Sequence, residues 1–180
     1  MSLIIFLLIN VVGLILVGGL LIAITSDKSI NYISKIPNIL RWLLLPFFSL
    51  LGLALIEASI RFLTEALSVF WPSGDVYFNV LFSGYLLIPL LGTYGLCWFA
   101  HLMAPSFQFT SSITIGVIYV SLNIFFFFAD DFTIYTDVIV ERMTQNESAG
   151  VFGSFVFIAA KIAGLWISYN SAKNDSFWFF

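Results

Sequence analysis

The start of the chain is a long stretch without charge, and this feature constrains the fold more than any other. Residues 2–24 contain no Asp, Glu, Lys or Arg. A helix of about 20 apolar residues crosses a hydrocarbon core about 30 Å thick. The stretch is longer than the apolar region of a signal peptide, and no basic residues precede it. We therefore predict an uncleaved helix that spans a membrane.

The rest of the chain has the same character. Of its residues, 61% are hydrophobic and 9% are charged, whereas a soluble domain carries about 25% charged residues. So few charges cannot cover a surface that faces water, which excludes a soluble enzyme, a disordered chain and a disulfide-stapled secreted domain. We predict an all-α, polytopic integral membrane protein: a helical bundle of about five transmembrane helices plus an interfacial amphipathic helix, in one transmembrane domain over residues 1–180.

Turn residues and charges divide the chain into five predicted spans, which cover approximately residues 2–24, 40–70, 76–103, 109–129 and 151–169. Residues 25–39 are predicted to form a loop that ends near Pro37. Between the last two spans, apolar residues recur at helical spacing over 132–146, which predicts the interfacial helix. Four spans are the alternative, if the first segment is removed or only lies in the interface.

The distribution of basic residues predicts an orientation. Cytoplasmic loops of membrane proteins are enriched in Lys and Arg. With five spans, Lys28, Lys35, Arg41 and Lys173 fall on one side of the membrane, and Arg142 is alone on the other. We therefore predict an outer N-terminus and a cytoplasmic C-terminus.

Four charged residues fall inside apolar stretches. Glu57, Arg61 and Glu65 are spaced by four residues, so they share one helix face, and Lys161 lies near the centre of the last span. Each unpaired charge at the bilayer centre costs roughly 2.5–3.5 kcal/mol. We predict that the second and fifth spans pack face to face, with Lys161 paired to Glu57 and Arg61 paired to Glu65 or Glu57.

This intramembrane charge network has three interpretations. In the first, it is a structural latch that fixes helix pairing. In the second, it is a proton or ion relay or a substrate site. In the third, some of the charges stay unpaired until a partner subunit binds. The face around Lys161 is small and polar, and Ser154, Ala160 and Gly164 are predicted to be its helix-packing residues.

Other candidate sites are weaker. Asp130 and Asp131 form a possible cation site at the outer surface, or else a solvated helix end. The single Cys97 and single His101 make a transition-metal site improbable, so we expect no metal and no cofactor. No cluster of Lys and Arg is present, which argues against a nucleic-acid partner.

Three functions are compatible with these features. The first is a non-enzymatic accessory, assembly or inhibitory (immunity-like) subunit of a larger membrane complex, which acts through helix–helix interaction. The second is a small oligomeric ion or proton channel or transporter that uses Glu57, Arg61 and Lys161. The third is an intramembrane enzyme, which we rank lowest. The expected partners are the lipid bilayer and either another membrane subunit or a second copy.

Overall fold

The computed structural model describes residues 3–70, 75–128 and 147–173. Within these ranges the fold is all-helical. The helices are α1 (Leu3–Thr25), α2 (Asp27–Lys35), α3 (Asn38–Ser68), α4 (Asp75–Met103), α5 (Gln108–Phe128) and α7 (Glu147–Lys173). All except α2 are long and apolar enough to cross a membrane. The predicted fold class, a membrane helical bundle, is confirmed.

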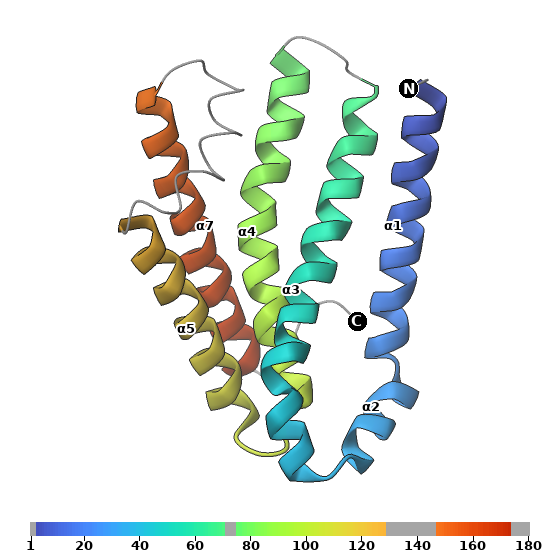
Figure 1. Cartoon of the computed structure of the whole chain (residues 1–180), viewed down its shortest axis with the longest axis vertical. Coiled ribbons are helices and arrows are strands. Elements are labelled where there is room, and N and C mark those ends of the chain that lie inside the picture. The colour runs from blue at the N-terminus through green and yellow to red at the C-terminus, as the bar shows by residue number, and fades with distance from the viewer. Residues whose placement is uncertain (1–2, 71–74, 129–146, 174–180) are drawn as a thin grey trace.

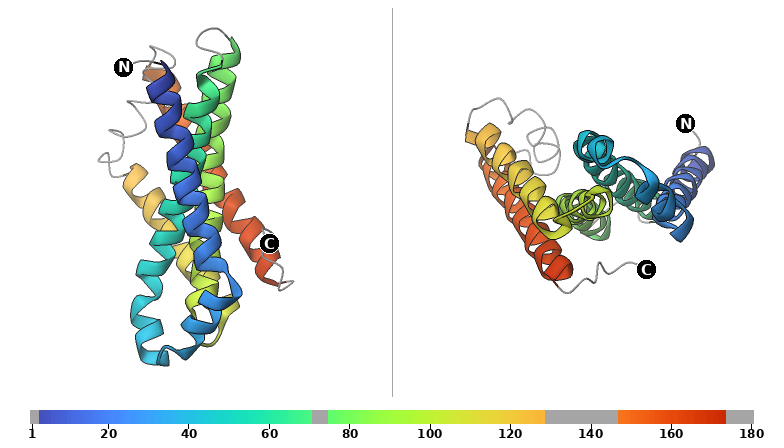
Figure 2. Two further views of the ribbon diagram at one scale, coloured as in Figure 1. Left: turned by 90° about the vertical axis from the view of Figure 1, so that its right-hand side faces the viewer. Right: turned by 90° about the horizontal axis from the view of Figure 1, so that it is seen from below.

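The five long helices form a curved row rather than a closed ring (Figures 1 and 2). In the view from below in Figure 2, α4 occupies the middle of the row. On one flank α4 packs along α3, and α3 in turn packs along α1. On the other flank α4 packs against α5 and α7, which also pack against each other.

The prediction that the second and fifth spans pack face to face is wrong. These spans are α3 and α7, and α4 lies between them. The reason lies in glycines at both contacts of α4. Gly95 meets Gly52 of α3 so closely that a Cβ at Gly52 would lie 2.6 Å from the Gly95 carbonyl oxygen. On the other flank, a Cβ at Gly164 of α7 would overlap the carbonyl oxygen of Leu90. Small residues let helix backbones approach closely in lipid, so α4 binds both helices.

The short helix α2 lies where the sequence predicts a loop, and this prediction is also wrong. Ser26 caps the helix, since its hydroxyl oxygen accepts a hydrogen bond from the Ser29 amide at 3.4 Å. Asp27 in the first turn and Lys35 in the last turn both complement the helix dipole. These capping and dipole signals are present in the sequence, but the segment is too short and too polar to resemble a span.

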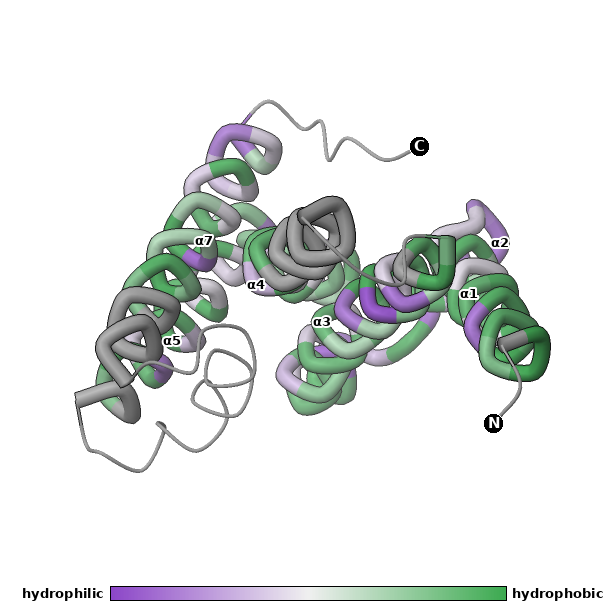
Figure 3. The backbone as a smooth tube through the Cα atoms, turned by 90° about the horizontal axis from the view of Figure 1, so that it is seen from above, coloured by the Kyte–Doolittle hydropathy of each residue, from purple (hydrophilic) through white to green (hydrophobic). Residues whose placement is uncertain are grey.

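Apolar surface covers most of the outside of the row. In Figure 3, hydrophobic residues extend around the outer faces of α1, α3 and α5. Among them, Ile15, Phe47 and Phe125 are all well exposed. Such a surface is suited to lipid rather than to water. The interfacial helix predicted over 132–146 lies outside the described residues, as do Asp130 and Asp131.

Candidate functional site

Lys161 is a buried cation in the middle of α7. Its side chain is 3% exposed, and its ammonium group donates a hydrogen bond to Oδ1 of Asn123 on α5. The ammonium nitrogen also lies 4.8 Å from the ring centroid of Tyr119 and 4.7 Å from that of Phe157. Cation–π contacts gain strength when the cation is removed from water. Lys161 is therefore bound by α5 and by its own helix.

The local structure of α5 explains why Asn123 is the acceptor. Tyr119 and Asn123 are four residues apart, so they share one face of the helix. The amide nitrogen of Asn123 donates to the main-chain oxygen of Tyr119 at 2.7 Å. That bond directs the amide nitrogen towards its own helix, and the amide oxygen accepts from Lys161. The sequence analysis placed Lys161 in the network but did not identify Asn123 or Tyr119 as its partners.

Glu57 of α3 lies against α4 at Gly92. A Cβ on Gly92 would lie 3.0 Å from Cγ of Glu57 and 3.1 Å from its Oε1. The absence of a side chain at Gly92 thus leaves room for the half-buried carboxyl group. Glu57 interacts electrostatically with Arg61 and with Lys161. It also interacts electrostatically with Tyr119.

The predicted salt bridges are not formed. Among the residues that the structure describes, no Lys or Arg nitrogen lies within 4.0 Å of a carboxylate oxygen. Lys161 and Glu57 interact electrostatically across the bundle, but α4 separates their helices and Asn123 takes the hydrogen bond instead. Arg61 likewise acts on Glu57 without a close ion pair, and it forms none with Glu65.

Arg61 and Glu65 lie on the exposed side of α3. Ala54 is also exposed there, and Ala58 is half-buried between them. At 100° per residue, these positions lie opposite the face of α3 that packs Gly52 and Ile56 against α4. The structure therefore divides the predicted network: Glu57 points into the bundle near Lys161, whereas Arg61 and Glu65 point out of it.

The predicted packing face of α7 lies partly against α4. Ala160 is buried, and Gly164 contacts the main chain of Leu90. Ser154 belongs to α7, but its side chain is outside the described part of the structure.

Arg41 forms a contact that the sequence analysis missed. Its guanidinium is buried and donates hydrogen bonds to the main-chain oxygens of Leu102, Met103 and Ala104. These carbonyl groups lie at the C-terminal end of α4, where no further helical turn supplies N–H donors. Because Arg41 and Met103 are 62 positions apart, no local pattern indicates the pairing.

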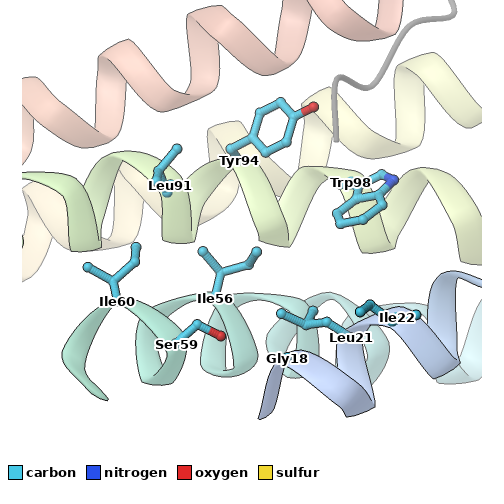
Figure 4. Close-up of a pocket in the computed structure, with 9 residues that line it drawn as sticks. All are labelled: Gly18, Leu21, Ile22, Ile56, Ser59, Ile60, Leu91, Tyr94 and Trp98. Carbon is cyan, nitrogen blue, oxygen red and sulfur yellow. The ribbon is translucent and has the colours of Figure 1, made fainter. Parts of the chain in front are cut away.

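A pocket of about 280 Å³ lies between α1, α3 and α4, on the opposite flank of α4 from Lys161 (Figure 4). Its lining is almost wholly apolar. The lining residues are Gly18, Leu21, Ile22, Ile56, Ser59, Ile60, Leu91, Tyr94 and Trp98. Within the described ranges, no group of three or more His, Cys, Asp or Glu side chains could hold a metal ion.

The fold and these charges define a membrane-embedded helical bundle with a polar cluster in its interior. Comparison with protein-family models, with curated proteins and with solved structures gives no match. Function must therefore be argued from the geometry.

Proposed function

We propose that the protein is a non-enzymatic subunit of a larger membrane complex, with an accessory, assembly or inhibitory role, and that it binds its partner through the outer face of α3. The observation that carries the proposal is Arg61. This arginine is exposed although it lies within the membrane-spanning part of α3, Asn38–Leu67. A lipid-facing cation in a span is costly and usually marks a functional contact.

The neighbours of Arg61 suit a helix as the partner. Ala58 and Ala54 lie about one and two turns before it, respectively, on the outward side of α3. Small residues allow a second helix to approach the backbone closely, and an acceptor on that helix would satisfy the guanidinium. The open row of helices leaves this face uncovered by α1, α4, α5 and α7.

The orientation also belongs to this proposal. Helix α2, the start of α3 and the C-terminal end of α7 all lie in the lower half of Figure 1. These segments carry Lys28, Lys35, Arg41 and Lys173. The enrichment of basic residues on the cytoplasmic side supports a cytoplasmic position for this end and an outer N-terminus.

The test is the mass and composition of the protein after gentle extraction from its native membrane. We expect a stoichiometric second membrane chain, lost in the Arg61→Gln variant and retained in Lys173→Gln, which removes an exposed cation at the end of α7. A photoreactive residue at position 58 should crosslink to that chain. A lone monomer, or a complex whose composition is unchanged by Arg61→Gln, contradicts the proposal.

A small ion or proton channel or transporter is the second candidate. The observation that favours it is the pair of opposite charges, Glu57 and Lys161, which interact inside the bundle on either side of α4. Intramembrane acids and bases commonly mark ion pathways. This candidate predicts flux in liposomes that contain only this chain, abolished by Glu57→Gln without loss of folding. Absence of flux in folded, reconstituted protein argues against it.

A further inference from the structure

We propose that the pocket between α1, α3 and α4 binds one acyl chain of an anionic phospholipid whose headgroup lies against α2. This inference is independent of the proposed subunit function, because it concerns the opposite side of α3. It rests on the shape and lining of the pocket, on Trp98 and on the charges of α2.

The pocket is suited to hydrocarbon rather than to water. A buried water needs two to four polar partners. The hydroxyl of Ser59, a polar group in the wall, already donates to the main-chain oxygen of Leu55 at 2.8 Å. Leu91, Ile56 and Ile60 are among the apolar lining residues, and in Figure 4 the side chains of Ile56 and Ile60 point from α3 towards α4.

Gly18 of α1 lines the pocket, and it has no side chain to occupy it. A Cβ at this position would meet nothing within 4 Å, so the wall formed by α1 leaves room for a bound chain. A helix with its side chains is about 10–12 Å wide. Because the space is about 280 Å³ and is bounded by three helices, it admits a single flexible chain and not a further helix.

Trp98 supplies a polar group at one end of the pocket. Its side chain is 8% exposed, and no described residue accepts a hydrogen bond from its indole N–H. In Figure 4 the indole nitrogen lies at the edge of the ring farthest from Leu91. An ester carbonyl of a lipid is an acceptor of the right kind, and Trp favours the depth of the membrane interface.

Helix α2 provides the charge for the headgroup. It follows α1 directly, a few residues beyond Ile22 of the pocket lining. Lys28 and Lys35 are both exposed on α2. These two cations outnumber the one acid of the helix, the exposed Asp27. Exposed Lys residues at the membrane surface attract anionic headgroups, which favours an anionic over a zwitterionic phospholipid.

The experiment uses the full chain in phosphatidylcholine vesicles that contain a phosphatidylglycerol with a photoreactive acyl chain. After illumination, peptide mapping should place the label on pocket residues of α1, α3 and α4. Gly18→Leu adds a branched side chain to the wall of the pocket and should lose most of this label. Gly19→Leu is the matched control, because its added side chain also meets open space but does not line the pocket; it should keep the label.

Two further comparisons test the headgroup and the indole. Unlabelled phosphatidylglycerol should compete better than phosphatidylcholine, and this preference should disappear in the Lys28→Gln, Lys35→Gln double variant. Trp98→Phe should weaken labelling while the fold is retained. Equal labelling of the Gly18 and Gly19 variants, a label spread evenly over the outer helix faces, or equal competition by both lipids overturns the proposal.

Discussion

The guanidinium of Arg41 donates from Nε to the main-chain oxygen of Met103 at 3.1 Å. A second nitrogen, Nη2, reaches the oxygens of Ala104 at 3.0 Å and Leu102 at 3.4 Å. One side chain near the start of α3 thus satisfies three carbonyls at the end of α4. This contact joins two neighbouring helices of the row at the end where α2 also packs, since Ile33 and Ile36 lie against Leu45 and Met103.

Loss of the hydrogen bonds from Arg41 to the end of α4 should destabilise the fold. Arg41→Met removes the donor to the main-chain oxygens of Leu102 and Met103, whereas the Ala104 oxygen also accepts from Gln108. Hydrogen bonds to a charged group are each worth about 1.5–3 kcal/mol. We expect the free energy of unfolding in mixed micelles, measured by titration with sodium dodecyl sulfate, to fall by about 3 kcal/mol. Lys35→Met, which alters an exposed cation, is the control. A change in Arg41→Met no larger than in this control contradicts the role of Arg41.

Lys161 should be coupled to Asn123 more strongly than to Glu57. Asn123→Leu removes the amide oxygen that accepts a hydrogen bond from the buried ammonium, which should cost about 3 kcal/mol. Adding Lys161→Met should restore most of that loss, because a buried polar pair replaced by apolar groups is often neutral. The measurement is a double-mutant cycle on the free energy of unfolding.

The matched cycle pairs Lys161→Met with Glu57→Gln. Since no close ion pair joins these residues, its interaction energy should be the smaller of the two. The reverse order would show that the long-range attraction between Glu57 and Lys161, and not the hydrogen bond, fixes the position of the lysine.

Gly164→Ala should separate α7 from α4. The new methyl group would overlap the carbonyl oxygen of Leu90, which belongs to a helix backbone and cannot rotate away. Overpacking of this kind costs about 1–3 kcal/mol or more. Gly19→Ala is the control, because its Cβ meets open space. Distances between spin labels on α4 and α7 should increase only in the Gly164 variant, and an unchanged distance with unchanged stability argues against close contact there.

Phe107, in the turn between α4 and α5, has a φ of 51°. A residue with a Cβ is strained in this left-handed region by about 1–2 kcal/mol, whereas glycine is not. Both Phe107→Gly and Phe107→Ala remove the exposed ring, so their difference reports the backbone alone. We expect the Gly variant to be about 1 kcal/mol more stable than the Ala variant in unfolding titrations. Equal stabilities would indicate that the turn relaxes to a negative φ.

The position of the membrane spans could be predicted from the sequence because length and apolarity suffice for it. A stretch such as residues 2–24 has to satisfy its backbone hydrogen bonds internally in lipid, and only a helix does so. The same reasoning located Glu57 and Lys161 within spans. It failed for α2, because a short polar helix is recognised by its Ser26 cap and end charges rather than by an apolar run.

The neighbours of each helix were decided only in the tertiary structure. Lipid is as apolar as a leucine side chain, so a span shows no periodic difference between the face that meets lipid and the face that meets another helix. The opposite charges of Glu57 and Lys161 near the middle of their spans therefore favoured direct contact of their helices. Instead, α4 lies between them because Gly52 fits closely against Gly95 and Gly164 against Leu90. By itself the sequence determined that this chain is a set of membrane helices. Close packing at small residues determined their order, and with it the partner of Lys161 and the exposure of Arg61.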